Sequence, residues 1–193
     1  MNKPVIATNI DELLIKHAAF VEPHKAIWKI LIEKTGDKSL KKWIGKKDYF
    51  IGVNLAMDKI MPDATKEEKT LRVRTWYQEE VIKYIQDNPS CVNRHILERL
   101  KQLKTKYFLV LITTNTQKHI NKIVEAAGLT KLYDVIIASE TEKEPDKSEL
   151  IDTLIEEHGK PKYYLTGKDD PKIIEKLNKL EIKIINKNEL DSI

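Results

Sequence analysis

The sequence has little cysteine and no long apolar run, and each shortage excludes classes of protein. Cys91 is the single cysteine among 193 residues, so no intramolecular disulfide can form. No stretch approaches the ~20 consecutive apolar residues that a bilayer-spanning helix needs. The apolar run near the N-terminus is short and soon interrupted by acids, which does not fit a signal peptide. We therefore predict a cytoplasmic protein without a membrane partner.

The charge of the chain is nearly balanced. It carries 34 basic and 30 acidic residues, for a formal net charge of +4, and the two signs are interspersed. The sequence lacks a concentrated basic block of the kind that tracks a phosphate backbone. The charge pattern therefore disfavours a nucleic acid as the partner.

Five short apolar runs, rich in β-branched or aromatic residues, predict buried strands because both of their faces are apolar. They are Val5–Thr8, Tyr107–Thr113, Asp134–Ala138, Tyr163–Thr166 and Ile182–Ile185. Helical patterns separate the last four runs, at Lys118–Ala127, Lys147–Glu157 and Pro171–Leu180. This alternation predicts an α/β fold, a Rossmann-like doubly wound parallel sheet of about five strands.

The segment that follows the first strand has a different character, with several helical patterns and no convincing strand. We predict an all-helical inserted domain at residues 17–89, and an α/β core domain at residues 1–16 and 90–193. Trp28, Trp43 and Trp76 fit the core of a small helical bundle. The alternative is a surface that faces the active-site crevice, where an anionic ligand could meet basic side chains of the insertion, namely Lys46, Lys47, Arg72 and Arg74.

Ligands of an open parallel sheet bind at the carboxyl ends of the strands, near the point where the strand order reverses. Polar residues follow four of the predicted strands and are expected to line one crevice there. They are Asn9 and Asp11, Thr114 and Asn115, the loop Ser139–Asp146, and the turn Gly167–Asp170.

Four motifs in this order and spacing resemble the haloacid dehalogenase superfamily, including its members with a C1-type helical cap after the first strand. The motifs are "VIATNIDELL", "LVLITTNTQKHINKIVEAAGL", "YDVIIASE" with "KEPDKSEL", and "YYLTGKDD". The resemblance covers essentially the whole chain. It implies phosphoryl transfer through an aspartyl phosphate, with a first Asp as nucleophile and a second as general acid and base. It also implies a magnesium ion, a lysine from the third motif, and an acid from the fourth motif that holds the metal.

Placed on this chain, the resemblance puts an amide where the family has its nucleophile. Asn9 falls on the nucleophile position, and an amide oxygen is too poor a nucleophile to form an acyl phosphate. Asp11 falls on the general acid and base, and Thr114 on the phosphate-binding hydroxyl, so these two residues are retained.

The third and fourth motifs also depart from the family pattern. Glu144 falls on the lysine position and Lys168 on the metal-holding acid. We hypothesise a reversed Glu144–Lys168 ion pair that fills the metal site, so that magnesium binds poorly or not at all. A shift of the fourth motif by one residue would instead put Asp169 on the metal position, with Asp170 beside it. The distance to the next strand favours Lys168 in register.

Simpler roles for these residues remain open. Asn9 and Asp11 could only hydrogen-bond the turn after the strand, and Thr114 and Asn115 could be a helix N-cap instead of an anion site. Our leading hypothesis is a catalytically inactive pseudo-phosphatase without a cofactor. It would act as a binding or regulatory module for an unknown protein or a small anionic ligand. The alternative is a magnesium-dependent phosphatase of a small phosphorylated metabolite.

Overall fold

The computed structural model describes residues 3–139 and 146–193. The chain divides into two compact units, which we call the core unit (Met1–His17 and Asn88–Ile193) and the helical unit (Ala18–Asp87). The boundaries expected from the sequence lie one or two residues from these. Each unit is described by itself below.

The described residues of the core unit form a parallel sheet of five strands in the order β3-β2-β1-β4-β5. The strands are β1 (Val5–Thr8), β2 (Phe108–Thr116), β3 (Val135–Ser139), β4 (Tyr163–Thr166) and β5 (Lys183–Asn186). Every apolar run that predicts a strand forms one, and the doubly wound α/β class is confirmed. The order reverses at β1, because the chain adds β2 and β3 on one side of it and β4 and β5 on the other.

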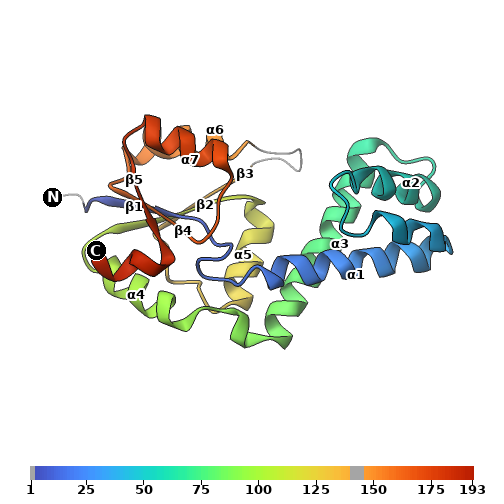
Figure 1. Cartoon of the computed structure of the whole chain (residues 1–193), viewed down its shortest axis with the longest axis horizontal. Helices are drawn as coiled ribbons and strands as arrows, with labels where there is room; N and C mark the ends of the chain where they lie inside the picture. Colours follow the sequence, from blue (N-terminus) through green and yellow to red (C-terminus); the bar gives the residue numbers. More distant parts are fainter. Residues whose placement is uncertain (1–2, 140–145) are drawn as a thin grey trace. The chain divides into compact units, whose positions relative to one another are not determined.

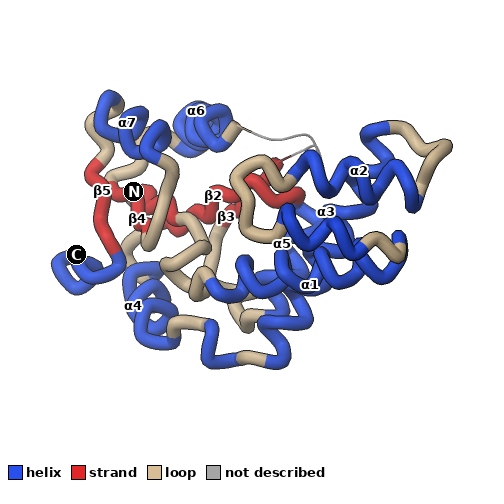
Figure 2. The backbone as a smooth tube through the Cα atoms, turned by 45° about the vertical axis from the view of Figure 1, so that its right-hand side comes forward, coloured by secondary structure: helices blue, strands red, loops and turns tan. Residues whose placement is uncertain are grey.

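Helices cover both faces of the sheet (Figures 1 and 2). On one face lie α6 (Lys147–His158) and α7 (Pro171–Lys179), and on the other lie α4 (Arg94–Lys104) and α5 (Gln117–Ala126). Alternate strand residues point to the α6–α7 face, where they form one apolar cluster with the two helices. Members of this cluster include Val5, Ala7, Val110, Ile112, Ile151, Leu154, Ile173 and Leu177. Short 3-10 helices, η2 (Pro89–Cys91) and η3 (Lys187–Ser192), complete the unit.

The helical unit is built on two long helices, α1 (Ala18–Thr35) and α3 (Lys66–Asp87), with a 3-10 helix η1 (Lys38–Trp43) and a shorter helix α2 (Phe50–Ile60). Its core contains Trp28, which is 1% exposed, and Trp43 and Trp76 pack against that core. The bundle-core interpretation of the tryptophans is therefore correct. Helix α1 begins at Ala18 and accommodates a buried proline, Pro23, within its second turn.

The stability of the helical unit is expected to depend on pH through His24. Its ring lies edge-on to Tyr49, with ring centroids 4.5 Å apart, and burial lowers the pKa of the imidazole below its usual value. The unfolded chain therefore binds a proton more readily than the folded chain, so stability falls as the pH drops below about 6.5. Thermal unfolding at pH 7.5 and 5.5 should show a larger loss for the unmodified chain than for His24→Phe, which cannot titrate. Equal losses would contradict the assignment.

Candidate functional site

Asn9 lies at the centre of the candidate site, at the carboxyl end of the middle strand. Its backbone N–H donates to the Leu165 carbonyl at 3.2 Å, which continues the pairing of β1 with β4. The residue is only 4% exposed. Its side-chain Nδ2 donates to Thr166 Oγ1 at 2.8 Å and to the Lys168 carbonyl at 2.6 Å. The amide thus joins the turn after β1 to the turn after β4.

Gly167 allows these two turns to approach so closely. A Cβ at this position would collide with the backbone of Glu12 and Leu13. The missing side chain lets the chain after β4 lie against the chain after β1. This contact brings Lys168 and Asp169 within reach of Asn9.

Asp169 is the buried acid of the site, with a side chain that is 5% exposed. Its Oδ2 accepts hydrogen bonds from three donors: Lys147 Nζ at 2.6 Å, the Tyr164 hydroxyl at 2.6 Å, and Asn9 Nδ2 at 3.3 Å. Its Oδ1 accepts from the backbone N–H of Asp170 at 3.0 Å. Both carboxylate oxygens are therefore engaged, and Lys147 supplies the opposite charge.

Tyr164 and Lys147 are held for this contact by the elements that carry them. Tyr164 belongs to β4, and both burial and the neighbouring Asp169 raise the pKa of its hydroxyl far above the usual range, so it stays protonated as a donor. Lys147 is the first residue of α6, whose N-cap is Asp146. Its ammonium also lies 5.7 Å from the centre of the Tyr164 ring.

Asp11 pairs with a histidine. His17 Nδ1 lies 3.0 and 3.1 Å from its two carboxylate oxygens, and the Asp11 side chain is 36% exposed. The adjacent Glu12 has a left-handed backbone, with φ of 58°. Its carboxylate accepts from the His17 N–H and pairs with Lys187, whose hydrogen bond is the main cause that lowers the pKa of Glu12. The turn after β1 is thus fixed by several side-chain contacts.

The second strand ends differently from the sequence-based expectation. Thr114 and Asn115 belong to β2, and the N-cap of α5 is Thr116, so the helix N-cap interpretation of the two residues is wrong. The buried hydroxyl at this edge is that of Thr113, which is 5% exposed and accepts from the Asn115 backbone and side chain at 3.2 and 3.1 Å. Thr114 is exposed.

The structure describes only one residue of the hypothesised reversed ion pair. Glu144 lies outside the described residues, so the Glu144–Lys168 pair stays a prediction. Lys168 is exposed, and it contacts Asn9 through its backbone carbonyl. The ion pair that the structure does place beside Asn9 is Lys147–Asp169. Asp170 caps α7 by accepting from the Lys172 N–H at 2.8 Å.

Sequence reasoning missed Lys147, Tyr164 and Thr166 as members of this site. Tyr164 and Thr166 lie within a predicted strand, where alternation does not reveal which polar atom meets a neighbouring loop. Lys147 lies within the third motif, in "KEPDKSEL", but nothing in its local sequence identifies Asp169, 22 residues later, as its partner. The proximity of β4 and the start of α6 supplies that information.

The side chains around Asp169 do not fit a magnesium ion. Magnesium requires oxygen ligands in near-octahedral geometry, whereas the groups that face Asp169 Oδ2 are an amide N–H, an ammonium and a hydroxyl hydrogen. Among residues 3–139 and 146–193, no group of three or more His, Cys, Asp or Glu side chains is arranged to hold a metal. The amide and the lysine satisfy the buried carboxylate instead.

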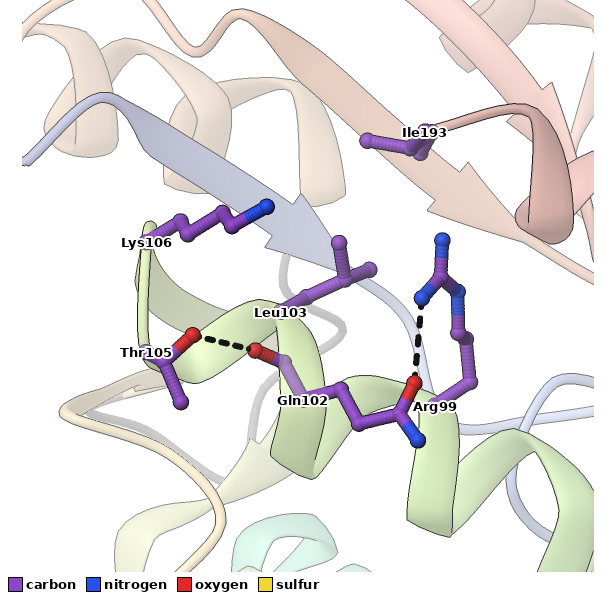
Figure 3. A pocket seen from close by; sticks show the side chains of 6 residues that line it. All are labelled: Arg99, Gln102, Leu103, Thr105, Lys106 and Ile193. Carbon is purple, nitrogen blue, oxygen red and sulfur yellow. Dashed lines mark hydrogen bonds between the residues drawn. The ribbon is translucent and has the colours of Figure 1, made fainter.

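A separate hollow of about 340 Å³ lies beside the C-terminal end of α4 (Figure 3). Leu103, Thr105 and Lys106, which line it, directly precede β2, so it lies by the amino end of that strand and away from Asn9. Figure 3 shows two hydrogen bonds to Gln102. Arg99 donates to its side-chain oxygen, and the Thr105 hydroxyl donates to its backbone carbonyl. Both contacts stay within α4 and its C-cap residue Thr105.

Comparison with known proteins identifies the family. The model of the haloacid dehalogenase-like hydrolases matches residues 25–172, and the chain belongs to this family. The matched range begins after the first motif, so it does not include Asn9. No curated protein matches the sequence at a significant level. Within the described residues, no helix is long and apolar enough to cross a membrane.

Solved structures share the fold at low sequence identity. A haloacid dehalogenase-like family protein from Streptococcus pneumoniae superposes with a TM-score of 0.60 at 15% identity, covering 94% of this chain and 83% of that one. A β-phosphoglucomutase from Clostridium difficile gives a TM-score of 0.59 at 16% identity, covering 99% and 88% of the two chains. A predicted phosphoglycolate phosphatase from Haemophilus somnus gives 0.52 at 17% identity, covering 86% and 77%.

Proposed function

We propose that this chain is a binding member of the haloacid dehalogenase-like hydrolases that does not hydrolyse phosphate esters. The observation that carries the proposal is the set of hydrogen bonds from Asn9 Nδ2 to Thr166 Oγ1, the Lys168 carbonyl and Asp169 Oδ2. The side chain on the nucleophile position acts as a donor to the turn after β4. It contributes no nucleophilic oxygen to a reaction.

The three acceptors favour an amide over a carboxylate at position 9. With the amide turned over, its oxygen would face three other oxygens, so the hydrogen bonds fix the orientation of the side chain. A carboxylate there would place two negative charges about as far apart as Asn9 Nδ2 and Asp169 Oδ2 are now, 3.3 Å. Such a pair needs a cation between its members, or a proton on one of them. Asn9 and Lys147 remove that need.

Loss of the nucleophile alone is sufficient to abolish useful turnover. Enzymes accelerate the slowest uncatalysed reactions, such as phosphate-monoester hydrolysis, by up to ~10²¹. An exposed Asp11 paired with His17 supplies at most acid–base chemistry, which contributes roughly 10² to 10⁴. What the site keeps is binding capacity. Lys147 has further N–H donors beyond the one that Asp169 accepts, and Thr113 has a hydroxyl hydrogen.

These remaining donors, the Lys147 ammonium and the Thr113 hydroxyl, support the binding of a small anion or of an acidic group of a protein partner. The competing function is a magnesium-dependent phosphatase, favoured by the retained Asp11 and Asp169 and by the phosphatase and phosphomutase names of structural neighbours.

Hydrolysis of para-nitrophenyl phosphate separates the two functions. With millimolar magnesium, the unmodified chain should release phosphate no faster than buffer, and Asn9→Ala should be indistinguishable from it. Metal-dependent turnover that is abolished in Asp11→Ala and Asp169→Ala would establish the phosphatase and refute the proposal.

A further inference from the structure

Exposed apolar side chains are concentrated in one short segment of the helical unit. Ile44, Phe50, Ile51 and Leu55 are 40 to 51% exposed, and they make up four of the six large apolar residues found exposed in the described part of the chain. We call these four residues the apolar tip. The other two, Val21 and Leu71, lie on α1 and α3.

Helix α2 carries apolar residues on its exposed side as well as on its buried side. The buried side contains Val53, Ala56 and Met57. The exposed side contains three residues of the apolar tip, Phe50, Ile51 and Leu55, where a solvent-facing helix usually carries polar residues only, beside the polar Asn54, Asp58 and Lys59. A clustered exposed apolar face of this kind marks an interaction surface.

The charge beside the apolar tip is strongly positive. Residues 38–55 contain five lysines, one aspartate and no arginine or glutamate. The net charge of this segment is therefore +4, which equals the formal net charge of the entire chain. All five lysines are exposed: Lys38, Lys41, Lys42, Lys46 and Lys47. Two copies joined through this face would bring like charges together, which disfavours self-association. The charge fits an anionic partner.

The position of the segment within the helical unit suits a flat partner. Helix η1 and α2 follow the end of α1 and precede the start of α3, so they lie at the end of the unit opposite to its chain entry at Ala18 and exit at Asp87. Aliphatic side chains and lysines at one end of a helical unit can enter the interface of a bilayer without a shaped pocket. Nucleic acid offers no comparable environment for Ile51 and Leu55.

We propose that the apolar tip and its lysines form a peripheral binding site for an anionic lipid surface. Phe50, Ile51, Leu55 and Ile44 enter the headgroup region, and Lys46 and Lys47 contact the anionic headgroups. The sequence-based expectation of no membrane partner rested on the length of apolar runs, which concerns spanning segments. A peripheral contact needs only a few exposed apolar side chains and several cations.

Co-sedimentation of the full chain with vesicles tests this site. Vesicles that contain about 30 mol % phosphatidylserine in phosphatidylcholine should bind the chain, pure phosphatidylcholine should bind it at least about 10-fold more weakly, and salt should weaken the binding. Each lysine near an anionic surface contributes a factor of about 5, so Lys46→Gln with Lys47→Gln should lower the affinity about 25-fold. Phe50→Ser with Ile51→Ser should also abolish most binding.

Matched controls distinguish the site from general charge attraction. Lys172→Gln with Lys183→Gln removes the same charge from the core unit, and Val21→Ser with Leu71→Ser removes exposed apolar residues outside the tip. Both should bind vesicles within about 2-fold of the unmodified chain. Circular dichroism checks that every variant is folded. Absent vesicle binding at low salt, equal losses in the controls, a preference for duplex DNA, or a dimer that Phe50→Ser with Ile51→Ser dissociates would each overturn the proposal.

Discussion

Replacing Asn9 with aspartate is expected to make the stability of the chain depend on magnesium. The new carboxylate loses the donor contacts to Thr166 and Lys168 and lies beside Asp169 at the present separation of 3.3 Å. Two unit charges that close repel by about 5 kcal/mol at an effective dielectric of 20, part of which protonation relieves. In EDTA we expect a loss of about 3 kcal/mol in the free energy of unfolding, or roughly 6 to 12 °C in Tm.

Magnesium should reverse most of this loss, because a cation that binds only the folded state at about 100 times its Kd restores about 2.7 kcal/mol. Thermal unfolding of Asn9→Asp with EDTA and with magnesium measures both effects. Asn9→Leu is the first control, since it loses the same donors without adding charge and should be destabilised equally in both buffers. Asn54→Asp, an exposed amide-to-acid change, should respond to neither buffer. An Asn9→Asp variant as stable in EDTA as the unmodified chain would contradict the account.

The second large effect is expected at Lys147. Changing it to methionine keeps the apolar part of the side chain and leaves Asp169, 5% exposed, with a buried charge and only the hydrogen bonds from Asn9, Tyr164 and its own neighbour. Removing one member of a buried ion pair costs about 3 to 5 kcal/mol. Urea unfolding should therefore show a loss of that size for Lys147→Met, against less than about 0.5 kcal/mol for the exposed Lys172→Met.

A double-mutant cycle tests whether this loss comes from the pair itself. Lys147→Met combined with Asp169→Asn removes both charges. The double variant should therefore be more stable than the sum of the two single losses predicts, by about 2 kcal/mol. Additive losses would show that Lys147 and Asp169 act independently, and they would contradict the proposal that their ion pair stabilises the site.

Much of the fold could be predicted from the sequence because buried parallel strands leave continuous apolar runs. Val5–Thr8 and Tyr163–Thr166 were placed by that signal alone, and the structure gives them the same bounds. The start of α1 is harder to predict from the sequence. Proline is rare inside a helix, so Pro23, the sixth residue of α1, argues from the sequence against a helix that begins before it.

The site was predicted only in part, for a physical reason. Asn9 and Asp169 were identified because they follow strands whose carboxyl ends meet at one edge. The identity of the partners depends on the direction of each side chain within its turn. Lys168 and Asp169 are neighbours in the chain, but the Lys168 side chain points to solvent and the Asp169 side chain points to the interior. Local sequence favoured Lys168 at the inner position. The close contact at Gly167, which turns the Lys168 carbonyl toward Asn9, has no counterpart in local sequence.

The pairing of Asn9 with Asp169 can be measured most directly in crystals grown with millimolar magnesium and phosphate. We expect Asn9 Nδ2 to remain within hydrogen-bonding distance of Asp169 Oδ2, with Lys147 Nζ on the same oxygen and no metal between the side chains. An octahedral ion in contact with both Asn9 and Asp169 would show that the site still holds magnesium, and it would contradict the central claim.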